Sequence, residues 1–353
     1  MSRTSTGLRV VTGAGGFIGG HVVKRLLRDG LPVRAVDCKP FARWHQRFDA
    51  AENLQLDLSD SRAYFQAVHG AQEVYNFAAD MGGMGFIENN KARCMLSVLV
   101  NSHLLVAARE FAVERFFFAS SACVYAAGRQ TSPDVTPLTE ADAYPAMPED
   151  GYGWEKLFSE RMCRHFTEDF GLSTRVARLH NVYGPFGTFA GGREKAPAAI
   201  CRKVVEAVMS DRGTIDIWGD GEQTRSFMFV DDCVEGVMRM MNEPDGEDHQ
   251  ASEPMNLGSS QLVSINRLVD IVEHIAGVKL RRRYDLGAPQ GVRGRNSDNT
   301  LIRSRLGWEP STALEDGLRP TYDWIAAEVT AARGDASLGR RVESLTPRSL
   351  EVA

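Results

Sequence analysis

Short apolar runs alternate with amphipathic stretches through the first half of the chain. Runs such as VRAVD and RFFFAS are rich in β-branched and aromatic residues, which is typical of strands buried on both faces. The stretches between them have the amphipathic pattern of helices. This alternation predicts a parallel sheet with helices on both faces. The expected strands cover residues 8–12, 32–37, 54–57, 73–78, 115–120 and 173–179, and the expected helices cover residues 16–28, 60–68, 89–112 and 150–170.

The pattern changes after Tyr183, where short elements and loops rich in glycine and arginine follow. These segments predict a smaller domain that lines a cleft, while residues 230–241 predict a helix that returns to the first domain. We therefore expect an α/β fold: a Rossmann-type doubly wound parallel sheet with a smaller, interleaved α/β substrate-binding domain. The expected ranges are 7–185 with 225–255 for the sheet domain, 186–224 with 256–330 for the smaller domain, and 331–353 for a polar, mobile tail.

Composition narrows the classes of partner. The formal net charge of the 353 residues is −5, which gives no electrostatic basis for binding nucleic acid or an anionic membrane. No apolar run approaches the ~20 residues that cross a bilayer, and the polar first residues do not resemble a signal peptide. The six cysteines form no C-x-x-C pair, which favours a reducing cytoplasm over a disulfide framework or a metal site.

The segment VVTGAGGFIG contains a glycine triplet between an expected strand and helix. Gly13, Gly16 and Gly19 follow a G-x-x-G-x-x-G pattern, and Phe17 and Ile18 open the helix. Glycine lets the backbone turn sharply and approach a pyrophosphate, which then sits on the free N–H groups of the helix N-terminus. The position of this motif at the first strand–helix junction predicts a dinucleotide site.

Two aspartates are candidates for the remainder of the cofactor. Asp37 lies 18 residues beyond Gly19, at the end of the second expected strand. A carboxylate there accepts hydrogen bonds from the ribose 2′-hydroxyl and repels a 2′-phosphate, which favours NAD, although Lys39 and Arg43 leave NADP open. Asp57, after the next strand, is a candidate for contact with the adenine.

A Y-x-x-x-K pair lies on the helix expected at residues 150–170. The spacing places Tyr152 and Lys156 on one helix face. An ammonium beside a phenol stabilises the phenolate, so the tyrosine can take a hydroxyl proton while a hydride leaves the same carbon. Ser121, which follows the strand RFFFAS, is placed to hold that hydroxyl.

These motifs, in this order, resemble the extended short-chain dehydrogenases, and HNVYGP is typical of their sugar-nucleotide branch. Longer strings resemble the GDP-mannose 3,5-epimerase family over the range from about Val10 to Trp324. They are AADMGGMGFIE, SSACVY, GGREKAPAA, WGDGEQTRSF and GVRGRNSDN.

The resemblance implies an NAD-dependent isomerase that epimerises GDP-mannose at C3 and C5. A transient ketone at C4 acidifies the hydrogens at C3 and C5, and no net oxidation occurs. Cys123 and Lys195 are implied as the acid–base pair, with GDP-L-galactose or GDP-L-gulose as products. Homologous enzymes also imply a homodimer formed by the helices expected at 89–112 and 152–169.

The same resemblance implies a set of substrate-binding residues. The loop at residues 81–85 has little side-chain bulk and suits close approach to a sugar, and four basic residues suit the diphosphate and nucleoside. Arg295 and Lys203 are two of these. The implied set is Gly82, Ser121, Ala122, Cys123, Asn181, Glu194, Lys195, Ala196, Lys203, Gly219, Asp220, Gly221, Arg225 and Arg293.

Other readings stay open at this point. A 4,6-dehydratase would carry a carboxylate pair beside Ser121, where this chain has Ala122 and Cys123. A 4-epimerase has no need of a Cys/Lys pair, and a non-catalytic NAD sensor has no need of Ser121, Tyr152 and Lys156. Ala126 and Trp154 depart from the family pattern, which leaves the product selectivity open.

Overall fold

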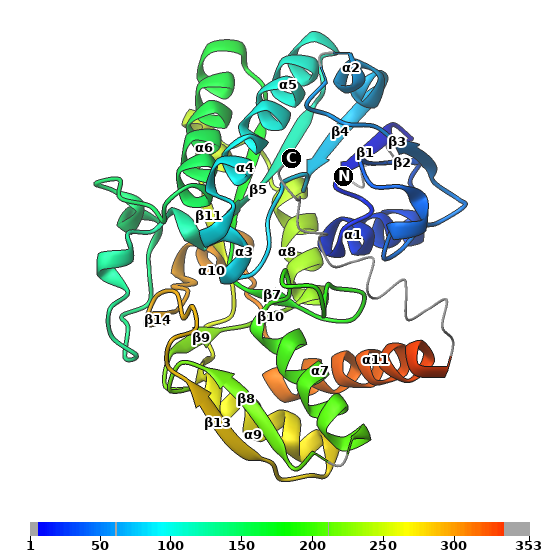
Figure 1. Cartoon of the computed structure of the whole chain (residues 1–353). Coiled ribbons are helices and arrows are strands. Elements are labelled where there is room, and N and C mark those ends of the chain that lie inside the picture. The colour runs from blue at the N-terminus through cyan, green and yellow to red at the C-terminus, as the bar shows by residue number, and fades with distance from the viewer. Residues whose placement is uncertain (1–5, 61, 211, 335–353) are drawn as a thin grey trace, which may run out of the picture.

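A seven-stranded parallel sheet forms the larger part of the molecule (Figure 1). The computed structural model describes residues 6–60, 62–210 and 212–334. All neighbouring strands of this sheet run parallel, in the order β11-β6-β5-β4-β1-β2-β3. The order reverses between β1 and β4, which is the switch point where doubly wound sheets bind ligands. The strands are β1 Leu8–Thr12, β2 Val33–Asp37, β3 Glu52–Gln55, β4 Ala71–Asn76, β5 Arg115–Ser121, β6 Thr174–Leu179 and β11 Met255–Leu257.

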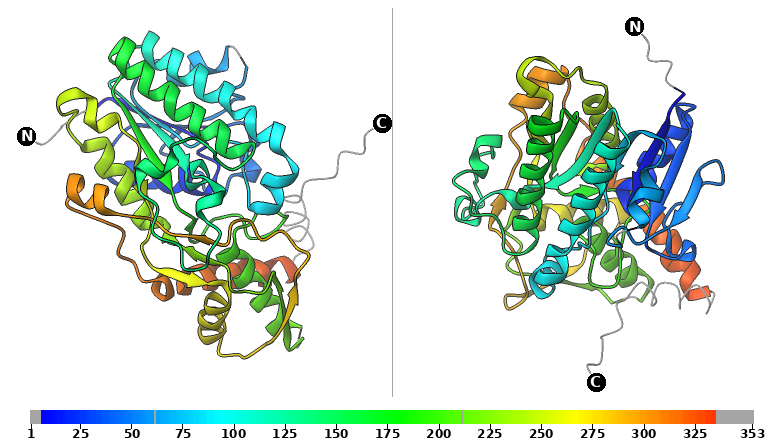
Figure 2. Two further views of the ribbon diagram at one scale, coloured as in Figure 1. Left: turned by 90° about the vertical axis from the view of Figure 1, so that its left-hand side faces the viewer. Right: turned by 90° about the horizontal axis from the view of Figure 1, so that it is seen from above.

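Helices cover both faces of the sheet because alternate strand residues point to opposite faces. Val11 and Phe117 pack in one core with α1 and α8, whereas Val10 and Phe116 pack in another with α2, α5 and α6. Figure 2 shows α5 and α6 side by side on the outside of this layer. The helices of this part are α1 Phe17–Arg28, α2 Ala63–Val68, α3 Met84–Asn89, α4 Lys91–Met95, α5 Ser97–Glu110, α6 Tyr152–Phe170, α8 Val230–Asn242 and α10 Thr300–Leu306.

A smaller part lies below the carboxyl edge of the sheet in Figure 1 and has a core of its own. Ile217, Leu268 and Leu318 are buried in this core, which unites α7, α9 and α11. Strand β8 pairs with β13 in parallel, and β9 lies between β12 and β14. The elements are α7 Ala196–Met209, β8 Thr214–Trp218, β9 Thr224–Ser226, β12 Leu262–Ser264, α9 Ile265–Ala276, β13 Arg281–Asp285, β14 Gly294–Arg295 and α11 Leu314–Gly334.

The chain passes between the two parts more than once. A short parallel pair, β7 Val182–Tyr183 and β10 Met228–Phe229, precedes α8. Val230 and Cys233 of α8 are buried in the core that contains α1, so this helix packs against the main sheet. Strand β11 extends the main sheet, and Ile302 of α10 lies in the same core. The predicted domain ranges stay a prediction. Residues 331–334 end α11, and the rest of the expected tail lies outside the described residues.

Local patterns placed most elements of the sheet correctly, with two kinds of difference. The helix expected at 89–112 is two helices, α4 and α5, and the chain leaves helical conformation just before them at Asn90, where φ is −134°. The strands expected at 54–57 and 73–78 lie two residues earlier in the chain. The apolar pair Phe77 and Ala78 extended the second prediction, but this pair packs against the glycine turn instead. None of the described helices combines the length and the apolar character needed to span a bilayer.

Candidate active site

The glycine turn joins β1 to α1 at the carboxyl edge of the main sheet. Gly13 has a φ of +71°, and a Cβ there would lie 2.7 Å from the carbonyl group of Phe77. A Cβ on Gly19 would lie 2.3 Å from the carbonyl oxygen of Gly13, so both positions need glycine. Gly16 is the N-cap of α1, and no side chain caps this end. The helix N-terminus is therefore accessible to a pyrophosphate, which such N-termini bind through backbone N–H groups.

Phe17 and Ile18 form the first turn of α1, and both are partly buried against the core. Asp37 ends β2 beside this turn. Its Oδ2 accepts a hydrogen bond from Gly15 N at 3.0 Å, and its Oδ1 accepts one from Lys39 N at 2.9 Å. A carboxylate has about four acceptor sites, so capacity remains for ribose hydroxyls. A glycine cradle with a buried carboxylate at its edge fits NAD.

Asp57 is exposed just beyond β3. Its Oδ1 accepts hydrogen bonds from Ser59 N at 3.0 Å and from Ser59 Oγ at 2.7 Å. These bonds form a local turn, which by itself explains an aspartate at this position. Contact between Asp57 and an adenine stays a prediction.

Ser121, Tyr152 and Lys156 meet where β5 and α6 approach each other. Tyr152 is the first residue of α6, and its phenol shares a hydrogen bond with the hydroxyl of Ser121, the last residue of β5. Lys156 lies one turn further, with Nζ 5.5 Å from the centre of the Tyr152 ring. Gly153 permits this approach, because a Cβ there would lie 2.3 Å from the carbonyl oxygen of Cys123.

Burial governs the titration of the phenol. It raises the pKa of Tyr152 well above the ordinary value, the negative charges of Cys123 and Glu155 act in the same direction, and the hydrogen bond to Ser121 opposes them. Lys156 is buried and forms an ion pair of 3.5 Å with Glu155. From the sequence we expected the ammonium of Lys156 to stabilise the phenolate. In the folded protein, burial of Tyr152 decides the direction in which its pKa moves.

Cys123 lies in the 3-10 turn η2 Ala122–Val124, directly after Ser121. Its thiol is buried, and its backbone N donates to Ser121 Oγ at 3.2 Å. The guanidinium of Arg295 approaches the thiol, with Nη1 3.7 Å from Sγ. Arg295 is held by an ion pair with Glu149 and by a hydrogen bond of 2.6 Å from Nε to Gln130 Oε1. A cation beside a thiol favours the thiolate. Arg295, which we expected at a diphosphate, is thus directed to the thiol.

Lys195 is the N-cap of α7, where Ala196 and Pro197 begin the helix. Burial lowers the pKa of Lys195, and the negative charges of Cys123 and Cys233 oppose this effect. Across residues 6–60, 62–210 and 212–334 no hydrogen bond or ion pair engages Lys195 Nζ. Such an amine is suited to exchange a proton with a substrate.

Glu194 and Gly82 lie in two loops that are in contact, since Gly83 N donates to Arg193 O at 3.0 Å. Glu194 Oε1 forms an ion pair of 3.3 Å with Arg202. Gly82 precedes α3, and a Cβ there would lie 2.8 Å from the side chain of Phe86. Asn181 has a φ of +36° between β6 and β7, and its Nδ2 donates to Ser226 O at 3.1 Å.

A second group of predicted residues follows β8. Gly219 and Gly221 have φ values of +73° and +78°, which position the turn that holds Asp220. Arg293 binds both carboxylate oxygens of Asp220, at 2.8 and 2.9 Å, and holds the pKa of Asp220 at about 2. Arg225 donates to three backbone carbonyls, and burial lowers its pKa to about 10. Of these two arginines, Arg225 is the one that no carboxylate pairs within the described part of the chain.

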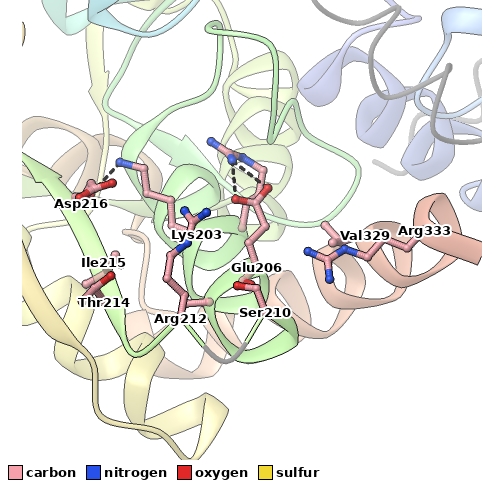
Figure 3. Close-up of a pocket in the computed structure, with 11 residues that line it drawn as sticks. Lys203, Glu206, Ser210, Arg212, Thr214, Ile215, Asp216, Val329 and Arg333 are labelled. Atoms are coloured by element: carbon pink, nitrogen blue, oxygen red, sulfur yellow. Dashed lines mark hydrogen bonds and ion pairs between the residues drawn. The ribbon is translucent and has the colours of Figure 1, made fainter.

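Lys203 lies on α7, apart from the predicted catalytic residues. It lines a cavity of about 450 Å³ between α7, β8 and α11, shown in Figure 3, and its Nζ donates to Asp216 O at 2.8 Å. No predicted catalytic residue lines this cavity. Within the described residues no cluster of three His, Cys, Asp or Glu side chains is placed to hold a metal ion.

The structure thus joins Ser121, Cys123, Tyr152 and Lys156 around η2 and the start of α6, and it places Lys195 at the N-terminus of α7. It places Asp220 and the two arginines on the β8 side of the smaller part. The contribution of Glu149 was not predicted from the sequence, because it depends on an ion pair with Arg295, which is far away in the chain.

Known proteins resemble this chain in sequence and in fold. A GDP-mannose 3,5-epimerase of Oryza sativa subsp. japonica is 46% identical over 320 residues, which are 90% of this chain and 82% of that protein. A GDP-mannose 3,5-epimerase of Arabidopsis thaliana is 44% identical over 328 residues, which are 93% of this chain and 84% of that protein. The crystal structure of a UDP-glucose 4-epimerase with UDP-glucose from Thermotoga maritima superposes with a TM-score of 0.80. It is 26% identical in sequence, and the match covers 91% of this chain and 99% of that one.

The family model of the NAD dependent epimerase/dehydratase family matches residues 9–258. This range includes the glycine turn, η2, the start of α6 and Lys195. The expected fold and the expected cofactor are confirmed together by this match and by the parallel sheet. The chain belongs to the NAD-dependent epimerase/dehydratase family.

Proposed function

We propose that the protein epimerises GDP-mannose at C3 and C5 by way of a transient 4-keto sugar. The observation that carries this proposal is the buried thiol of Cys123, whose backbone N donates to Ser121 Oγ and whose side chain packs in one cluster with Tyr152. A 4-epimerase needs only the serine, the tyrosine and a redox cofactor, so it leaves the thiol and the amine unexplained. The two plant relatives, at 46% and 44% identity, bear the name of this reaction.

The first step is oxidation at C4. NAD, which the glycine turn and Asp37 would hold, would supply a reversible hydride acceptor for C4. Tyr152 takes the proton of the C4 hydroxyl while Ser121 holds that hydroxyl. Lys156 lies one helical turn away and favours the phenolate by its positive charge, against the effect of burial.

The second step exchanges protons on carbon. A C4 ketone lets the electron pair at C3 or C5 delocalise as an enolate, so a base of moderate strength can remove the proton. Cys123, whose Sγ lies 3.7 Å from Arg295 Nη1, takes this proton as the base. Lys195, whose pKa burial lowers, gives a proton to the opposite face of the same carbon. The substrate keeps its proton count, and its configuration is inverted.

The nucleotide end binds to the cations on the β8 side. Arg225 is the guanidinium best placed for the diphosphate, because carbonyls alone hold it within the described chain. Inversion at both carbons gives GDP-L-galactose, whereas inversion at C5 alone gives GDP-L-gulose. We also propose a cytoplasmic enzyme, since all six cysteines are free thiols.

The proposed assembly is a homodimer through α4, α5 and α6. Large apolar side chains are exposed along these adjacent helices, with Leu96 at 61% and Phe158 at 53%. Met95, Leu99, Val106 and Trp154 are also exposed there. Exposed apolar faces of this kind are typical of protein–protein interfaces, and two copies would bury them in a four-helix bundle.

Incubation with GDP-mannose in heavy water tests the reaction. We expect deuterium at C3 and C5, measured by NMR of the sugar, and no accumulation of reduced cofactor. Interconversion with GDP-talose, the C4 epimer, without label at C3 or C5 would instead identify a 4-epimerase. Formation of a 4-keto-6-deoxy sugar would identify a dehydratase.

A further inference from the structure

The loop that carries Lys195 is fastened to the loop after β4 by a set of contacts that the reaction above does not use. Asp80 Oδ1 accepts a hydrogen bond of 2.6 Å from Arg193 Nη1. The same nitrogen donates to Met81 O at 3.2 Å. Gly83 N donates to Arg193 O at 3.0 Å, so backbone and side chain of Arg193 are both held. The guanidinium also stacks on Phe86, 3.7 Å from the ring centre.

The loop after β4 is itself fixed to the catalytic side of the cleft. Asp80 N donates to Ser97 Oγ of α5 at 3.0 Å. Phe86 belongs to a buried cluster with Cys123 and Tyr152. The contacts of Arg193 therefore connect the amine-bearing loop, two residues before Lys195, to the residues that surround the thiol.

We propose that Asp80 is a positioning residue that sets Lys195 opposite Cys123 by holding Arg193. This inference rests on the proposed function. Proton delivery to the face opposite the thiol depends on the position of a flexible four-carbon side chain, and the N-cap residue that bears it has no ion pair of its own among the described residues. The anchor is thus supplied two residues earlier. C4 oxidation uses residues of the sheet part alone and does not need this anchor.

The test separates these two steps in Asp80→Asn and Arg193→Gln. Proton exchange is the rate of deuterium entry at C3 and C5, and C4 oxidation is the amount of 4-keto sugar trapped by borodeuteride during turnover. We expect about 10- to 100-fold slower exchange, as for a misplaced catalytic group, with trapped ketone within about threefold of the wild type. Asp80→Glu keeps the carboxylate and should restore most of the exchange.

Two variants control for the loss of an ion pair as such. Glu235→Gln breaks the 2.8 Å pair with Arg25, whose side chains are 24% and 31% exposed, close to the 25% and 28% of Arg193 and Asp80. Arg93→Gln removes the second cation on Asp80 and leaves Arg193 in place. Both should exchange protons at close to the wild-type rate.

Exchange at the wild-type rate in Asp80→Asn would overturn the proposal. Equal loss of exchange and of trapped ketone would also overturn it, since that result indicates a general structural role. A wild-type enzyme that exchanges no deuterium would instead refute the proposed function, so the two failures are distinguishable.

Discussion

Gly83→Ala should displace the loop that carries Lys195. Gly83 lies in extended conformation just before α3, so alanine is permitted by the backbone there. An added Cβ, however, would lie 2.4 Å from the carbonyl oxygen of Glu194, the residue before Lys195. Ordinary contact begins at 3.4 Å, so the two segments must separate by about 1 Å. The obstacle is backbone, which cannot rotate away as a side chain can.

A displacement of this size predicts a specific kinetic defect. Misplacing a catalytic group by about 1 Å can cost on the order of 100-fold in rate. We expect this loss in deuterium exchange at C3 and C5, with NAD content and borodeuteride-trapped ketone little changed. The assay is NMR of GDP-mannose incubated in heavy water.

Gly85→Ala is the matched control. Its Cβ would meet only ring carbons of Trp218, at 3.7 and 3.8 Å, which is ordinary contact. This variant should exchange protons within about twofold of the wild type. If Gly83→Ala matched Gly85→Ala in exchange rate, the approach of the two loops would not position Lys195, and the reasoning would be refuted.

Three further predictions concern charge, pH and assembly. Arg295→Met removes the cation 3.7 Å from the Cys123 thiol and should slow deuterium exchange at C3 and C5 while the trapped ketone stays close to the wild-type amount; exchange at the wild-type rate would count against a role for this contact. Burial lowers the pKa of His180 from 6.5 to about 4, so His180 is neutral in the folded protein. The free energy of unfolding should therefore fall by up to roughly 3 kcal/mol as the pH drops from 6.5 to about 4. Denaturant titrations should show a smaller loss in His180→Gln, and equal losses would contradict this. Leu96→Glu with Phe158→Glu should give a monomer in sedimentation velocity, whereas Val208→Glu, at a site that is 45% exposed on α7, should leave a dimer.

Local sequence patterns predicted most of the fold and those candidate site residues that lie near one another in the sequence. The glycine turn, the strand that ends in Ser121 and the Y-x-x-x-K pair lie within single strand–helix junctions, where spacing alone determines which side chains share a face. Residues 89–112 were harder to predict, since no glycine or proline marks the breaks at Asn90 and Leu96 in the sequence.

The remaining contacts depend on how distant segments pack. Arg295 and Cys123 are 172 positions apart, and Arg193 and Asp80 are 113 apart. An arginine beside a glycine in the sequence is equally compatible with a phosphate, a carboxylate or a thiol. Only the fold brings β14 against η2, and so decides that Arg295 meets the thiol and that Arg293 meets Asp220.

Cys123→Ala tests most directly whether C4 oxidation and proton exchange at carbon are performed by different residues. The enzyme with this substitution should retain bound NAD, and borodeuteride should still trap a 4-keto sugar from GDP-mannose. Deuterium entry at both C3 and C5 should fall to background. Wild-type exchange in this variant would contradict the assignment of the thiol, and loss of the trapped ketone would contradict the separation of the two steps.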